Sequence, residues 1–138
     1  ATAQATIAQL RAQAATLGTC GDAAVAALHA PVTRTLDALA AATQWIVETW
    51  PRAPQAVAAV SVPYLKLWGT VAAGALMARA AGVAAGRLAA GGGDAAFYAA
   101  KIATAQFYVA HILPQAAALA QTVTEGAASV LAVDPAQF

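Results

Sequence analysis

The chain has 138 residues, 61% of them hydrophobic and only 9% charged, with a net charge of +1. So weak a net charge excludes the basic footprint of a nucleic-acid-binding protein, and the length is typical of one domain. Alanine makes up about a third of the chain, which favours helix, and so few charged side chains suggest buried faces beyond one small core.

The first predicted helix covers about Thr2 to Leu17, with Ile7, Leu10 and Leu17 on one side. The stretch "GTCGD" ends it, and Asp22 is placed to cap the second helix. That second helix is predicted from Ala23 to Trp50, where "PRAP" breaks it.

The third predicted helix runs from Pro63 to about Ala90, after a short linker. Three- and four-residue spacing predicts one core stripe through Leu65, Trp68, Ala72, Leu76, Arg79 and Val83. The turn at Gly91 to Gly93 comes next, and Asp94 is a good cap for the fourth helix.

The fourth predicted helix ends near Gly126 and is expected to kink at Pro114. Its core stripe consists of Tyr98, Ile102, Ala105, Val109, Ile112, Ala116, Leu119 and Val123. No stretch alternates with period two. The prediction is therefore an all-α fold, an up-down-up-down four-helix bundle over residues 1–138.

The C-terminal stretch "VLAVDPAQF" is too apolar for a solvated tail. We expect it to fold back on the bundle, through Val130, Leu131, Val133 and Phe138.

A second stripe on the fourth helix holds Phe97, Lys101, Thr104, Tyr108 and His111. Its semi-polar composition is typical of an interface, so Phe97, Lys101, Tyr108 and His111 are interface candidates. We expect the isolated chain to dimerise through them. The alternative is that the first helix, Thr2 to Leu17, covers this stripe and leaves a monomer.

Arg79 on an apolar stripe predicts a buried ion pair with Asp37, because an unpaired buried charge is costly. Ligand binding and snorkelling to solvent are the alternatives for Arg79. Lys101 has no obvious partner in the chain, which suggests that its partner lies on another surface.

No catalytic, cofactor-binding or metal-binding residue is predicted. Cys20 has no activating histidine nearby, and no acidic residue lies at metal-ligand spacing from His29 or His111. "GGGDA" follows no strand and precedes no GK[ST], so it is not a phosphate loop. The aromatic side chains are expected in the core rather than in a cofactor pocket.

Cellular location is indicated by weaker signals. One cysteine forms no internal disulfide, the polar start does not resemble a signal peptide, and the apolar stretches are too short or too polar to span a membrane. We expect a cytoplasmic protein that does not insert into membranes. The missing initiator methionine predicts a processed chain or a fragment of a longer one.

Three stretches together resemble the C-terminal helical domain of long bacterial acyl-CoA dehydrogenases of the 3-methylmercaptopropionyl-CoA dehydrogenase-like kind. They are "PYLKLWGTVAAGALMARAA" (63–81), "FYAAKIATAQFYVAHILPQ" (97–115) and "LAVDPAQF" (131–138). The resemblance extends over the whole chain and implies a parent oxidoreductase of fatty acid metabolism. In that family a glutamate takes the α-proton of an acyl-CoA, FAD takes the β-hydride, and an electron-transfer flavoprotein accepts the electrons.

None of the family's catalytic or flavin-binding motifs falls in this segment, and Glu48 and Glu125 lack the catalytic context. The resemblance therefore implies a non-catalytic accessory domain that packs on the catalytic body or on a neighbouring subunit of a homo-oligomer. The alternatives are an independent helical dimerisation module and, more remotely, a membrane-associated helix bundle.

Overall fold

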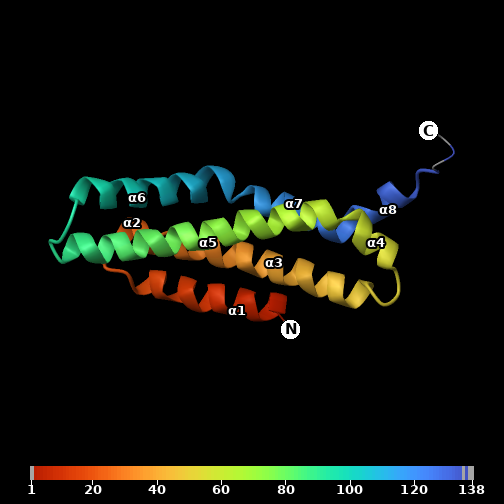
Figure 1. Cartoon of the computed structure of the whole chain (residues 1–138), viewed down its shortest axis with the longest axis horizontal. Coiled ribbons are helices and arrows are strands. Elements are labelled where there is room, and N and C mark those ends of the chain that lie inside the picture. Colours follow the sequence, from red (N-terminus) through yellow and green to blue (C-terminus); the bar gives the residue numbers. More distant parts are fainter. Residues whose placement is uncertain (1, 135, 137–138) are drawn as a thin grey trace.

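The computed structural model describes residues 2–134 and 136, and this part of the chain is helical, without a β-strand (Figure 1). The all-α prediction is confirmed. In chain order the elements are α1 (Thr2–Ala15), the 3₁₀-helix η1 (Thr16–Thr19), α2 (Ala23–Ala26), α3 (His29–Thr49), α4 (Pro54–Ala59), α5 (Ser61–Ala89), α6 (Ala95–Phe107), the π-helix η2 (Tyr108–Ile112), α7 (Gln115–Glu125) and α8 (Ala127–Leu131).

Helix α5 is the central element. It contacts α1, α3, α6 and α7, while α3 also contacts α1 and α7. In Figure 1, α1, α3, α5 and the α6–α7 segment lie lengthwise beside one another, and each runs opposite to the one before it in the chain.

Most helices begin and end where the sequence predicts. Asp22 accepts hydrogen bonds from the backbone N–H groups of Ala24 and Val25 at 2.9 and 3.1 Å, and Asp94 accepts one from Phe97 at 3.1 Å. The predicted second helix is in fact divided, because a turn at residues 27–28 separates α2 from α3. The linker after Trp50 forms the short helix α4, with Pro54 at its start.

The buried face of α5 differs from the predicted one. It consists of Leu67, Val71, Gly74, Ala75, Ala78, Ala81, Ala84 and Ala85, whereas Leu76 and Val83 are 51% and 59% exposed. Small residues face inward because the neighbouring helix lies close: a Cβ built on Gly74 would lie 2.7 Å from a methyl carbon of Leu113. The predicted stripe has the correct helical spacing, but only Trp68 and Ala72 pack on the core, whereas Leu65, Leu76, Arg79 and Val83 are exposed.

A kink was expected at Pro114, and the structure has a π-turn directly before this proline. Proline has no N–H and crowds the preceding turn, so the α-helical ladder cannot continue through it. The N–H of Leu113 instead donates to the carbonyl oxygen of Tyr108, five residues back, at 2.9 Å. The wider turn brings Leu113, 1% exposed, into the core, where Ile112 was expected.

The C-terminal prediction is wrong for the residues that can be assessed. Helix α8 lies against α4, yet Val130, Leu131 and Val133 are each about half-exposed. Phe138 lies outside the described residues.

Helix α5 is the one helix, within residues 2–134 and 136, that is long and apolar enough to cross a membrane by length and composition. The core helix of a soluble protein also satisfies these criteria, so the finding is weak evidence for a span.

Candidate interaction surface

The outward side of α5 carries an unpartnered apolar stripe. We call it the outer α5 face, and it comprises Leu65, Leu76, Arg79, Val83 and Arg87, all exposed. Their spacing of three, four or eleven residues aligns them along one side of the helix. Large aliphatic side chains in such an alignment form a contact surface rather than scattered exposed residues.

A groove runs along each side of this stripe. The α5–α6 groove, about 340 Å³, is lined by Leu76, Arg79, Ala80, Val83, Ala84, Phe97, Tyr98 and Lys101. The α1–α5 groove, about 450 Å³, is lined by Gln13, Thr16, Leu17, Cys20, Arg79, Gly82 and Val83. Because Arg79 and Val83 line both grooves, they form the ridge between them.

Phe97 and Lys101 form the far wall of the α5–α6 groove. They lie four residues apart on α6, which places them on one helix face. The Lys101 ammonium nitrogen is 5.1 Å from the centre of the Phe97 ring, within cation–π range, and the ring is still 52% exposed. The contact holds a positive charge at the edge of an apolar wall.

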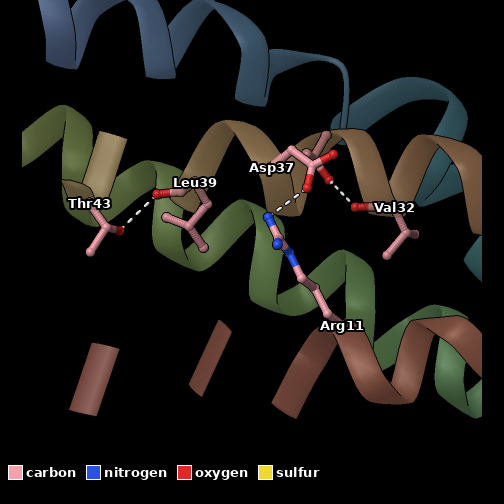
Figure 2. Close-up of polar contacts among 6 residues, drawn as sticks. Arg11, Val32, Asp37, Leu39 and Thr43 are labelled. Atoms are coloured by element: carbon pink, nitrogen blue, oxygen red, sulfur yellow. Dashed lines mark hydrogen bonds and ion pairs between the residues drawn. The ribbon is translucent and has the colours of Figure 1, made fainter. Parts of the chain in front are cut away.

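The predicted ion pair between Arg79 and Asp37 is wrong. Asp37 pairs with Arg11 of α1, with a nitrogen-to-oxygen distance of 2.5 Å, and both side chains are substantially exposed (Figure 2). Helix α3 contacts both α1 and α5, and the Asp37 side chain pairs with a residue of α1 rather than of α5. Arg79 is exposed and forms no ion pair within the described part of the chain.

Three of the four interface candidates are exposed, namely Phe97, Lys101 and His111. The fourth, Tyr108, instead packs on α5, where its hydroxyl donates to the carbonyl oxygen of Thr70 at 3.1 Å. Burial raises the pKa of Tyr108 above its ordinary value of 10.0.

Phe107 replaces Tyr108 on the exposed side of this segment. It is 58% exposed, and its ring is stacked on that of His111, with ring centres 4.7 Å apart. Helix α1 lies against α3 and α5 and leaves Phe97 exposed, so the expectation that the first helix covers this stripe is wrong.

Sequence reasoning missed Leu76, Val83 and Phe107 as surface residues. The available signal was that α5 is apolar on two sides, because Leu67, Val71 and several alanines form one stripe while Leu65, Leu76 and Val83 lie on another. Two apolar stripes on one helix leave open which of the two faces inward.

Two glutamates outside this surface form hydrogen bonds within their own helices. Glu48 accepts a hydrogen bond from Gln44 at 2.7 Å and Glu125 accepts one from Gln121 at 3.0 Å, each within one exposed helix turn. Over residues 2–134 and 136, no three histidine, cysteine or acidic side chains gather at distances suited to a metal ion.

Comparison with known proteins identifies the family. The family model described as "Acetyl-CoA dehydrogenase C-terminal like" matches residues 2–134, nearly the whole chain. A search of curated proteins found no match. The chain belongs to the family of C-terminal domains of acyl-CoA dehydrogenases.

Proposed function

We propose that this chain is the non-catalytic accessory domain of an FAD-dependent acyl-CoA dehydrogenase. It packs through the outer α5 face and the α5–α6 groove on the catalytic body or on a neighbouring subunit. The observation that carries the proposal is the exposed stripe of Leu76 and Val83 beside Phe97, in a chain that belongs to this C-terminal family.

Covering this stripe is energetically favourable. Each large aliphatic or aromatic side chain that becomes fully buried contributes roughly 1.5–3 kcal/mol. Leu76, Val83 and Phe97 are each about half-exposed, so an interface over them gains part of that amount per residue. The flanking Arg79 and Lys101 suit the polar rim of such an interface.

The family implies FAD in the parent enzyme. The glycine-rich turn of this chain is explained by its backbone geometry and packing. Gly91 and Gly93 adopt positive φ angles of 67° and 80°, and a Cβ on Gly93 would lie 2.9 Å from the Tyr98 ring. These glycines serve the turn and its packing, so we assign flavin binding and proton abstraction to the catalytic body.

The same proposal includes the subtype, location, assembly and electron acceptor of the parent enzyme and the topology of the domain. The parent is of the 3-methylmercaptopropionyl-CoA dehydrogenase-like kind, functions in fatty acid metabolism in the cytoplasm, forms a homo-oligomer and passes electrons to an electron-transfer flavoprotein. The domain itself is an up-down-up-down four-helix bundle that engages neither nucleic acid nor membrane. The family match supports the dehydrogenase parent and the alternating directions of the long helices support the bundle, whereas the subtype, location, oligomer and electron acceptor rest on the resemblance of the sequence motifs.

The test uses the full gene product. Val83→Asp places a charge on the outer α5 face, whereas Val47→Asp does so on α3, where the residue is equally exposed. We expect Val83→Asp to make residues 1–138 protease-sensitive and to lower acyl-CoA-dependent dye reduction, with Val47→Asp close to wild type. Equal behaviour of the two variants, or a gene product without flavin, would contradict the proposal.

An independent dimerisation module is the second candidate. The exposed Phe107–His111 ring pair and the exposed Phe97, on the same helix as Phe107, favour it. Sedimentation of the isolated chain at several concentrations tests it, and a strict monomer at every concentration excludes it.

A further inference from the structure

We infer that the partner in the α5–α6 groove is an acidic amphipathic helix from outside this chain. Its apolar side chains contact Leu76, Val83 and Phe97, and its carboxylates face Arg79 and Lys101. The inference rests on the proposed function and specifies the chemistry of the segment that occupies the groove.

The charged side chains that line the groove have one sign. Arg79 and Lys101 line it, and Arg87 continues the outer α5 face one turn beyond Val83. No acidic side chain is among the groove-lining residues, and none of these three cations forms an ion pair within residues 2–134 and 136. A partner with carboxylates at its edges is electrostatically complementary to this surface.

A second copy of this chain fits the charge pattern poorly through this face, because none of its six acidic side chains lines the groove. Asp37 is paired with Arg11, and Glu48 and Glu125 accept from glutamines. The remaining three accept backbone N–H groups, and they are Asp22, Asp94 and Asp134. A two-fold contact through this face would also bring Arg79 and Lys101 toward their own copies.

The partner is helical for two reasons. No strand edge exists in the described part of the chain, so an extended segment would find no backbone pairing, whereas a helix satisfies its own backbone groups. The ridge of Arg79 and Val83 between two grooves also has the form against which the side-chain ridges of another helix pack.

Lys101 is positioned for this role before binding. Its cation–π contact with Phe97 keeps the ammonium group at the groove edge and reduces the side-chain entropy lost when a carboxylate binds.

The test is site-specific photocrosslinking in the full gene product. A benzoylphenylalanine at Val83 probes the groove, and one at Val47 is the matched control at an equally exposed site. We expect the Val83 probe to crosslink to a helical peptide that carries acidic residues and lies outside residues 1–138. The Val47 probe should not yield that peptide.

Charge reversal completes the test. Arg79→Glu with Lys101→Glu should lower the crosslink yield by about tenfold, while Arg79→Lys with Lys101→Arg should retain most of it. Arg52→Glu, at an exposed site where the guanidinium contacts only the Glu48 carbonyl oxygen, is the control for net charge. Circular dichroism of each variant checks that the fold is intact.

Several outcomes would overturn the inference. They are a crosslink to a second copy of residues 1–138, a crosslinked peptide without acidic residues, the absence of any protein crosslink, or a yield that charge reversal leaves unchanged. If the Val83 probe crosslinks to a neutral or basic segment of the dehydrogenase body, this inference is wrong but the proposed function is supported. A gene product without flavin or acyl-CoA oxidation removes the proposed function itself.

Discussion

The buried hydroxyl of Thr43 links two helices through a short hydrogen-bond chain. Thr43 is 2% exposed, and its hydroxyl donates to the carbonyl oxygen of Leu39 at 2.7 Å (Figure 2). That bond uses its only hydrogen, so the Tyr64 hydroxyl, 2.9 Å away, is the donor in the contact between them. The chain thus connects α3 with the start of α5.

The two ends of this chain should respond differently to substitution. Thr43→Val removes the acceptor and leaves the Tyr64 hydroxyl unpaired, which should lower the free energy of unfolding by about 1–2 kcal/mol. Tyr64→Phe leaves the bond from Thr43 to Leu39 intact and should cost less, about 0.5–1 kcal/mol. Urea denaturation measures both, and the double variant should lose less than the sum. Additive losses would argue against the shared bond.

Tyr108 predicts a pH effect through its raised pKa. The neutral hydroxyl donates to Thr70, and desolvation disfavours the ionised form, so the folded-state pKa lies above the unfolded value of 10.0. The stabilisation is therefore complete below about pH 10 and is lost as the pH rises through the folded pKa. Tyr108→Phe should reduce the free energy of unfolding by about 0.5–1.5 kcal/mol near pH 8.

That deficit should shrink above about pH 10, because the wild type then loses the contribution that the variant never had. Denaturant titrations at several pH values provide the measurement, with Tyr98→Phe as a comparison, since no hydrogen bond from its hydroxyl is found in the described residues. A deficit that is constant with pH would mean that the pKa of Tyr108 is the same in the folded and the unfolded state.

At the scale of single helices, the glycines of α5 show which side of the helix is closely packed. A Cβ on Gly74 would meet Leu113 at 2.7 Å and Tyr108 at 3.4 Å, whereas a Cβ on Gly69 would meet nothing within 4 Å. The same residue type therefore has a packing role at one position and none at the other.

Substitution should separate these two roles. Gly74→Val should lower the free energy of unfolding by about 1–3 kcal/mol, because the core around Leu113 has no room for the added carbons. Gly69→Ala should raise it by about 0.5–1 kcal/mol, because alanine is the better helix former on an open surface. Thermal denaturation compares the two. A Gly74→Val protein as stable as wild type would show that α5 and the π-turn can separate at little cost.

The positions of most helices could be predicted from the sequence, because strong local signals set them. The caps at Asp22 and Asp94, the prolines after Trp50 and the glycine-rich turn each act within a few residues. The division between α2 and α3 and the helical form of the linker carry weaker signals.

Which side of each helix is buried was harder to predict from the sequence. Alanine buries too little area to be recognised as a core stripe, so the larger residues of α5 were placed inside, although they face out. The π-turn adds a residue to one turn, which a regular period of 3.6 does not anticipate, and Leu113 rather than Ile112 enters the core as a result. The partner of Asp37 depends on which neighbouring helix its side chain faces, and spacing along one chain contains no such information.

For the interaction surface, the sequence identified part of the residues. Phe97, Lys101 and His111 were recognised from a second stripe on one helix, and they are exposed. The contribution of α5 was missed because the groove exists only once α5 and α6 lie side by side.

For the whole molecule, the one-sided charge of the outer α5 face predicts how the isolated chain associates. Any contact between two copies through this face brings Arg79, Arg87 and Lys101 of each copy together. We expect weak, reversible dimerisation that strengthens from about 0.05 to 0.5 M salt, because screening reduces the repulsion while the apolar contact remains.

Sedimentation velocity over a range of concentrations and salt measures this dependence. Lys101→Gln should already dimerise more tightly at low salt, and Lys66→Gln serves as the matched control. A tight dimer that weakens with salt would show that the two copies meet through opposite charges on another face.

The two-sided apolar character of α5 has a consequence for biosynthesis. During translation α5 emerges from the ribosome before α6 and α7 do, so both of its apolar sides are at first exposed to the cell. Folding of the rest of the chain covers only the side with Leu67, Val71 and the alanines. We expect the side with Leu65, Leu76 and Val83 to bind chaperones or to promote aggregation until its partner segment covers it.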